Sequence, residues 1–224
     1  KKKIQLKYSQ TEVVSNVDEI KHPLFREALK TVGVNGVEIA TIADVPTGTG
    51  LGSSSSFTVG LLHSLYALQG KFVSSDRLAK EASHIEINVL KDPIGKQDHY
   101  AAAHGNLNFI EFHPDEAVSI EPIICSKNTK EELQRNLLLF YTGETRPASQ
   151  ILTEQQANTL NNEKIFNNLR QMKVLAQEIK DSLNGNDLNG FGEALHRGWL
   201  LKKSVASAIS TSVIDSYYEK ARSL

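Results

Sequence analysis

A loop rich in glycine and serine, residues 46–56, constrains the fold of this chain more than any other segment. Alternating apolar residues over 37–45 predict a strand before the loop, and apolar residues at helical spacing over 57–68 predict a helix after it. The first turn of a helix presents unpaired backbone N–H groups and the positive end of the helix dipole, and glycines let a ligand approach the backbone closely. The segment therefore predicts a phosphate-binding loop.

Other loops of similar composition fit this segment less well. A Walker loop ends in Gly-Lys-Ser/Thr, and residues 46–56 contain no lysine. A dinucleotide-binding loop has a third glycine where Ser53 stands, and a hydrolase nucleophile elbow needs a glycine that does not follow Ser54 at the required spacing. A flexible linker is the plain alternative, but we do not expect a linker between a strand and an amphipathic helix.

Composition excludes some classes of function. The formal net charge of −1 argues against a nucleic-acid-binding protein. Cys125 is the single cysteine, which rules out a disulfide within one chain and fits a reducing, cytoplasmic setting. The sequence has no apolar run long enough to span a membrane and no secretory signal. Because it lacks an initiator methionine and stops within a helical pattern, we interpret the chain as part of a longer protein.

Strand and helix patterns are interleaved in the first half of the chain, and helical patterns dominate the second half. Periodicity predicts further helices over 23–31, 148–160, 165–183 and 188–204, and further strands over 107–112 and 137–141. It also predicts a helix that Ser74 or Ser75 can cap and whose apolar face spans 78–89. The irregular stretch 114–130 is the predicted domain boundary. We therefore expect two domains, residues 1–125 and 126–224.

Two carboxylates beyond the loop are candidates for the chemistry of phosphate transfer. That reaction needs a magnesium ion and a group that handles the proton of the attacking hydroxyl. Glu86 lies near the end of the predicted helix 78–89, where a solvated helix face is the alternative. Asp98 follows a turn around Pro93 and Gly95, where a helix cap or an acid in a first helical turn is the alternative. Spacing alone leaves both roles open.

The loop resembles the phosphate-loop signature of the galactokinase, homoserine kinase, mevalonate kinase and phosphomevalonate kinase (GHMP) superfamily. Residues 46–55 match the signature Pro-x-x-x-Gly-Leu-Gly-Ser-Ser-Ala, with Ser55 in place of the alanine. The resemblance implies that the loop cradles the phosphates of ATP and that Ser54 lies beside magnesium. The phosphate-binding residues that it implies are Gly48, Gly50, Leu51, Gly52, Ser53, Ser54 and Ser55.

A second stretch, residues 86–105, resembles the family segment in which a glutamate precedes a Pro-x-Gly turn and a catalytic aspartate. The resemblance implies that Glu86 helps to bind magnesium and that Asp98 is the base, or the electrostatic partner, of the substrate hydroxyl. His99 stands where the sugar kinases of the family commonly have glutamine. Lys96 could lower the pKa of Asp98, touch a phosphate or be a surface lysine.

Several stretches resemble the D-glycero-D-manno-heptose 7-phosphate kinases of this family, namely residues 22–28, 93–98, 106–110, 141–146 and 198–203. The resemblance implies transfer of a phosphate from ATP to the sugar phosphate, with Mg²⁺. From charge and hydropathy we expect no nucleic-acid or membrane partner. A phosphorylated sugar needs cations at its far end, and we prefer Arg146 for this role. Lys202, Arg197 and Lys203 are further candidates, although Lys202 and Lys203 could form a solvated helix face.

The fold that the resemblance implies is α+β, with a phosphate-loop lobe over residues 1–125 and a helix-rich, ferredoxin-like lobe over residues 126–224. The first lobe lacks the amino-terminal family signature, and the second lacks the carboxy-terminal glycine-rich loop. Two alternatives remain: a related enzyme acting on fucose, galactose or mevalonate, or a sensor that binds ATP and sugar without turnover.

Overall fold

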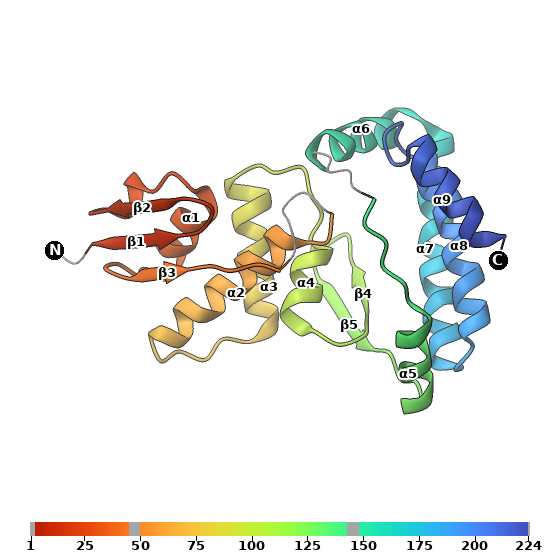
Figure 1. Cartoon of the computed structure of the whole chain (residues 1–224), viewed down its shortest axis with the longest axis horizontal. Coiled ribbons are helices and arrows are strands. Elements are labelled where there is room, and N and C mark those ends of the chain that lie inside the picture. The colour runs from red at the N-terminus through yellow and green to blue at the C-terminus, as the bar shows by residue number, and fades with distance from the viewer. Residues whose placement is uncertain (1–2, 45–49, 143–147, 224) are drawn as a thin grey trace. The chain divides into compact units, whose positions relative to one another are not determined.

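The computed structural model describes residues 3–44, 50–142 and 148–223. The chain forms two compact units, Lys1–Asn106 and Leu107–Leu224, and both contain helices and strands (Figure 1). The predicted α+β class is confirmed. No helix in the described ranges is both long enough and apolar enough to cross a membrane.

A three-stranded sheet in the order β2–β1–β3 forms one side of the first unit. The central strand β1 (Ile4–Lys7) pairs antiparallel with β2 (Thr11–Val14) and parallel with β3 (Glu38–Ala40). Alternation along β1 places Ile4 and Leu6 in the core, where both are buried. The strand predicted over 37–45 is shorter than expected, because β1 ends at Lys7 and offers β3 no further partner.

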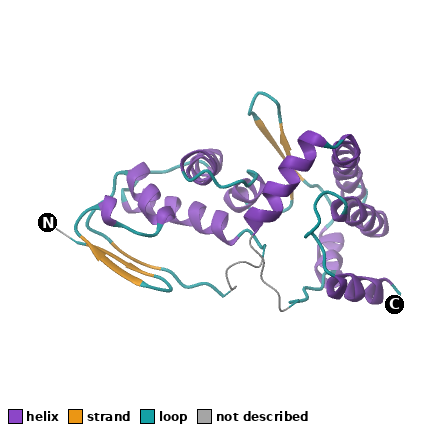
Figure 2. Ribbon diagram, turned by 90° about the horizontal axis from the view of Figure 1, so that it is seen from above, coloured by secondary structure: helices purple, strands orange, loops and turns teal. Residues whose placement is uncertain are grey.

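The helices of the first unit lie on one side of this sheet (Figure 2). They are α1 (Pro23–Val32), α2 (Ser53–Leu68), α3 (Ser75–Ser83) and α4 (Gln97–His104), with a short 3₁₀ turn at Val17–Glu19. Helix α2 contacts each of the other three helices. Its buried residues Leu62 and Leu65 join Phe25 and Leu29 of α1 in the core of the unit. The packing holds the start of α2, where the glycine-rich loop ends, in a defined position.

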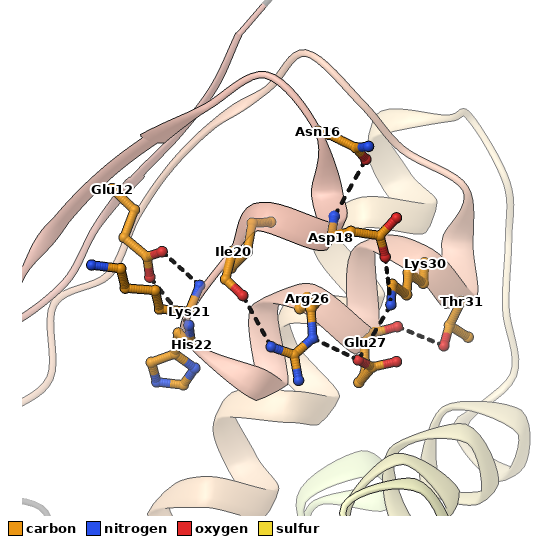
Figure 3. Close-up of polar contacts among 10 residues, drawn as sticks. All are labelled: Glu12, Asn16, Asp18, Ile20, Lys21, His22, Arg26, Glu27, Lys30 and Thr31. Carbon is orange, nitrogen blue, oxygen red and sulfur yellow. Dashed lines mark hydrogen bonds and ion pairs between the residues drawn. The ribbon is translucent and has the colours of Figure 1, made fainter.

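A buried carboxylate connects β2 to the start of α1 (Figure 3). Glu12 is 7% exposed and accepts hydrogen bonds from the backbone N–H groups of Lys21 (2.7 Å) and His22 (3.2 Å) and from the Tyr8 hydroxyl (2.8 Å). Burial alone would raise the pKa of Glu12, but these hydrogen bonds outweigh it and hold the pKa below its ordinary value. The carboxylate therefore stabilises this connection in its charged form.

The second unit contains a hairpin and a set of helices. Strand β4 (Asn108–Phe112) pairs antiparallel with β5 (Val118–Pro122), and α7 (Glu163–Asn184) packs along α8 (Leu188–Lys203). The other described helices of this unit are α5 (Lys127–Asn136), α6 (Ala148–Asn161) and α9 (Ser212–Arg222).

Contacts between the hairpin and α7 explain where the two units divide. Lys180 of α7 donates to Glu121 of β5 at 2.6 Å and lies over the ring of Phe109 at 4.7 Å. The backbone N–H of Ile124 donates to Asn184 at 2.9 Å. These contacts group the hairpin with the helices that follow it. The units therefore divide between residues 106 and 107, whereas the sequence predicts a boundary between 125 and 126.

Two segments of the second unit differ from their prediction. Residues 137–141 were expected to form a buried strand, but they have no strand structure and their side chains are 60–83% exposed. No partner strand lies beside this apolar run among the described residues, so a backbone ladder cannot form. Residues 114–130 were expected to be irregular, but they contain β5 and the first turn of α5.

Candidate functional site

The described end of the glycine-rich loop leads directly into α2. Gly50 and Gly52 have φ angles of +73° and +69°, in the left-handed region that favours glycine. Gly52 is the N-cap of α2, and the N–H of Ser56 donates to its carbonyl at 2.9 Å. The three N–H groups before Ser56 have no carbonyl partner within the helix. This end of α2 can therefore bind an anion.

The other predicted loop residues differ in accessibility. Ser53 is half-buried and Ser54 is exposed, so both hydroxyls can reach a ligand. Ser55 is buried, as fits a position where the family signature has alanine, and the Leu51 side chain is exposed. Gly48 lies outside the described residues.

A π-helical turn, His84–Val89, follows α3 and carries Glu86. The N–H of Leu90 donates to the carbonyl of Ile85, five residues back, at 2.9 Å. A π-helical turn shifts the side chains that follow it around the helix axis, and such turns are frequent at functional sites. Glu86 is 1% exposed, so the alternative of a solvated helix face is wrong.

Three side chains donate hydrogen bonds to the Glu86 carboxylate. Thr58 and His99 reach Oε1 at 2.8 and 3.1 Å, and Ser54 reaches Oε2 at 2.7 Å. Burial alone would raise the pKa of Glu86, but the hydrogen bonds from His99, Ser54 and Thr58 outweigh it and hold the pKa below its ordinary value. The fold therefore keeps a charged carboxylate at the start of α2.

The pair Ser54 and Glu86 has the donor atoms that magnesium prefers. Both offer hard oxygen ligands, and magnesium is often held by one or two carboxylates together with the phosphates of a substrate. Among the described residues, no group of three or more His, Cys, Asp or Glu side chains is arranged to hold a metal ion. The pair thus fits a magnesium ion that is shared with a phosphorylated ligand better than an ion held by protein alone.

Asp98 lies in the first turn of α4, against the loop. A β-carbon built on Gly52 would lie 3.2 Å from both Cγ and Oδ2 of Asp98. The N-cap of α4 is Lys96, so Asp98 is not the helix cap, although it remains an acid in a first helical turn. The Asp98 side chain is exposed. The fold thus brings an accessible carboxylate to the same end of α2 as Ser54.

The predicted substrate-binding cations lie in different parts of the chain. Lys96 is half-buried at the start of α4, in the first unit. Lys202 is half-buried in α8, in the second unit, and donates to Gln155 at 2.9 Å. Burial lowers the pKa of Lys202, and in the described part of the chain no carboxylate pairs with it. Arg146 lies outside the described residues.

The two remaining cations that were considered are engaged in ion pairs. Lys203 pairs with Asp215 at 2.7 Å, and Arg197 pairs with Glu178. A cation that already has a carboxylate partner is less available to a phosphate, so Lys202 is the stronger candidate of this group.

Sequence reasoning missed Thr58 and assigned no role to His99, and both are fully buried. Thr58 follows Ser54 by one helical turn, so helical spacing could have placed the two hydroxyls on one face of α2. The bond from His99 to Glu86 joins two separate elements, and no periodicity within either element indicates it.

Comparison with known proteins shows which family this chain is similar to. Residues 14–106 match the family model described as GHMP kinases N terminal domain. The chain is 30% identical over 181 residues to the D-glycero-alpha-D-manno-heptose 7-phosphate kinase of Campylobacter jejuni, which covers 81% of this chain and 53% of that protein. It is 26% identical to the galactokinase of Pyrococcus furiosus, covering 90% of this chain and 61% of that protein. The chain thus spans about half the length of the Campylobacter protein.

Solved structures show the same fold. A D-glycero-D-manno-heptose 1-phosphate kinase from Bacteroides thetaiotaomicron superposes with a TM-score of 0.72 at 22% identity, over 90% of this chain and 64% of that one. The phosphomevalonate kinase of Streptococcus pneumoniae gives a TM-score of 0.75 at 17% identity, over 100% of this chain and 74% of that one. Residues 14–106 therefore match the N-terminal domain of the GHMP kinases, and the chain has the fold of the solved kinases.

Proposed function

We propose that the protein containing this chain is an ATP-dependent sugar kinase that phosphorylates the anomeric hydroxyl of D-glycero-D-manno-heptose 7-phosphate. One observation carries the proposal: an anion-binding helix start, a charged buried carboxylate and an exposed aspartate meet at one end of α2. Ser54 contacts Glu86 at 2.7 Å, and Asp98 lies against Gly52. Phosphoryl transfer can use each of these groups, to hold the phosphates, to bind a metal ion and to orient the nucleophile.

Each of these groups has a separate task in the proposed reaction. The free N–H groups at the start of α2 would bind phosphate oxygens of ATP. Ser54 and Glu86 would hold magnesium, which neutralises charge on the phosphates when it is bound. The low pKa of Glu86 supports this role, because a metal ligand must be deprotonated.

Asp98 would receive the proton of the attacking hydroxyl. As the sugar oxygen forms its bond to the γ-phosphorus, the bond to the β-phosphate oxygen breaks and ADP leaves. The hydroxyl proton passes to the Asp98 carboxylate, which balances the charge that develops on the sugar oxygen. The exposure of Asp98 supports this role, because the sugar must reach it.

The sugar phosphate needs a cation at its far end. Lys202 is the strongest described candidate, because it is half-buried and its described partner, Gln155, is neutral. An ammonium without a charged partner in such a setting attracts an anion. Lys96 and Arg146 are the other predicted contacts. The assignment of heptose 7-phosphate is supported by the relative from Campylobacter jejuni.

A substrate panel tests the proposal. The full-length protein is incubated with Mg²⁺, ATP and one of heptose 7-phosphate, fucose, galactose or mevalonate, and ADP release is followed. Phosphorus NMR of the product then identifies the phosphorylated position. We expect rapid turnover with heptose 7-phosphate and a new signal from an anomeric phosphate. Binding of ATP and sugar phosphate without ADP release would instead favour a sensor.

Fucose is the second candidate substrate. Two relatives are fucokinases, one in a bifunctional protein of Arabidopsis thaliana (23% identical) and one in a bifunctional protein of Bacteroides fragilis (24% identical). Fucose carries no phosphate, so a fucokinase would need no cation at the far end of its sugar. Faster turnover of fucose, together with a Lys202→Met variant that turns over fucose at the wild-type rate, would favour this alternative.

A further inference from the structure

The two oxygens of Glu86 have different surroundings. Oε1 accepts from Thr58 and His99, which are both fully buried, whereas Oε2 accepts from Ser54, which is exposed at the end of the loop. Two donors from the protein interior therefore orient Oε1 inward. Because the carboxylate is planar, this also fixes the direction in which Oε2 faces the loop.

The tautomer of His99 follows from the same contacts. A carboxylate is only an acceptor, so the nitrogen 3.1 Å from Glu86 must carry a proton. Nδ1 of His99 is buried and has no hydrogen-bond partner among the described residues. Leaving an unprotonated Nδ1 without a partner costs less free energy than burying an N–H group that has no acceptor. His99 therefore has its proton on Nε2.

His99 also links two parts of the site. It is the neighbour of Asp98 in the first turn of α4, and its ring is 0% exposed. The hydrogen bond from His99 joins this turn to Glu86, while Asp98 lies against Gly52 of the loop. One buried side chain thus connects the helix that carries the proposed base to the proposed metal ligand.

We propose that His99 is a positioning residue that holds Oε1 of Glu86 inward through Nε2–H, so that Oε2 and the Ser54 hydroxyl are pre-arranged for a cation shared with the nucleotide. The inference rests on the proposed function, because it assigns a task toward the magnesium that this function requires. Partners that orient a metal ligand commonly contribute about 10–100-fold in metal affinity. A role in packing alone would lower stability and leave metal affinity unchanged.

Two substitutions separate positioning from packing. His99→Gln places an amide N–H near the position of Nε2, whereas His99→Met has a similar volume and no donor. His104→Met is the matched control, because His104 lies on the same helix and its nearest charged partner is Asp76, at 3.2 Å. Each variant of the full-length protein is titrated with Mg²⁺ in the presence of a fluorescent ATP analogue, and its thermal unfolding is measured.

We expect His99→Met to raise the half-saturating Mg²⁺ concentration at least about tenfold, with His99→Gln within about threefold of wild type and His104→Met unchanged. An unchanged half-saturation in folded His99→Met would overturn the inference. Glu86→Gln is titrated in parallel. If the half-saturating Mg²⁺ concentration of Glu86→Gln is also unchanged, the proposed metal site itself is wrong. If it rises in Glu86→Gln but not in His99→Met, only the proposed role of His99 is wrong.

A spectroscopic measurement on the wild type keeps the inference testable if His99→Met does not fold. Long-range ¹H–¹⁵N correlation spectra report which imidazole nitrogen carries the proton. We expect the Nε2–H tautomer for His99 and a shift of its Nε2 signal when Mg²⁺ is added with the ATP analogue. A proton on Nδ1, or a signal that does not respond to Mg²⁺, would contradict the inference.

Discussion

Glu12 and Glu86 are both buried carboxylates of the first unit, and their hydrogen-bond donors differ in kind. Glu12 accepts from the backbone N–H groups of Lys21 and His22, just before α1, and from the hydroxyl of Tyr8, between β1 and β2. Among the described residues, the Glu86 carboxylate accepts only from side chains, and one of them, Ser54, is exposed in the first turn of α2. In both residues the hydrogen bonds outweigh burial and hold the pKa below its ordinary value.

The difference separates a carboxylate with a structural role from the one for which we propose a role in function. Backbone donors hold a chain connection in place, and they offer a ligand nothing when they are already paired. A side-chain donor at an exposed helix start can keep its contact with the carboxylate while its oxygen faces a ligand. Burial and pKa alone therefore do not distinguish the two sites. The partners of each carboxylate distinguish them.

The largest expected effect is the loss of nucleotide binding when Gly52, which lies against Asp98, is replaced. Gly52→Val places a branched side chain at a φ of +69°, and its β-carbon would lie 3.2 Å from Asp98. We expect no measurable binding of a fluorescent ATP analogue to this variant of the full-length protein. Gly60→Val is the control, because nothing lies within 4 Å of a β-carbon at that position in α2. Wild-type affinity in Gly52→Val would refute the phosphate-loop assignment.

Asp98→Asn tests whether Asp98, which lies at the same end of α2 as Ser54 and Glu86, is the general base of the proposed reaction. The amide keeps the size of the side chain but cannot take a proton. A general base typically contributes about 10²–10⁴ in rate, so we expect turnover to fall at least about a hundredfold with little change in the Michaelis constants. Steady-state kinetics with ATP and heptose 7-phosphate measure both. A fall of less than about tenfold would leave Asp98 as an acid of the first helical turn.

Glu12→Gln tests whether Glu12 contributes to the stability of the fold and not to turnover. The Tyr8 hydroxyl and the N–H groups of Lys21 and His22 would then face an amide. An amide is a weaker acceptor than a carboxylate, and its NH₂ group is itself a donor. We expect the free energy of unfolding to fall by about 1–2 kcal/mol, while turnover per folded molecule stays at the wild-type level. Urea unfolding measures the change. Glu38→Gln, on strand β3 of the same sheet, serves as an exposed control. A loss of turnover in folded Glu12→Gln would place Glu12 in the functional site.

The smallest expected effect is on the pH dependence of stability. Because the folded pKa of Glu12 lies below its ordinary value of 4.5, its charged form stabilises the fold. This contribution is complete above the ordinary pKa and is lost as the pH falls through the folded pKa. Between about pH 6 and pH 3, unfolding free energies of Glu12→Gln should therefore decrease less steeply than those of wild type. Parallel slopes would show that Glu12 does not contribute.

Local patterns predicted the elements around the site well. The glycine-rich loop and the helix after it follow from residues 50–68, because positive φ angles and helical spacing are local properties. Periodicity also predicted a helix that contains Glu86 and extends to Val89. It could not predict the π-helical turn His84–Val89, whose backbone pattern buries Glu86. The contact between Glu86 and Ser54 depends on how α2 packs against that turn.

Features that depend on distant partners were predicted less well. The strand expected at residues 137–141 is absent because apolar composition alone does not supply a neighbouring strand. The compact units divide earlier in the chain than the predicted boundary, because Lys180 and Asn184 of α7, far along the sequence, contact the hairpin and the residues that follow it. The role of His99 was missed for the same reason, since its partner Glu86 lies in another element.

The most direct measurement compares the magnesium dependence of nucleotide binding in Glu86→Gln and Glu12→Gln, side by side in the full-length protein. Each variant is titrated with Mg²⁺ at a fixed concentration of a fluorescent ATP analogue. The account predicts that Glu86→Gln raises the half-saturating Mg²⁺ concentration at least about tenfold and that Glu12→Gln leaves it unchanged. An unchanged value in Glu86→Gln, or an equal rise in both variants, would contradict the assignment of Glu86 as the functional carboxylate.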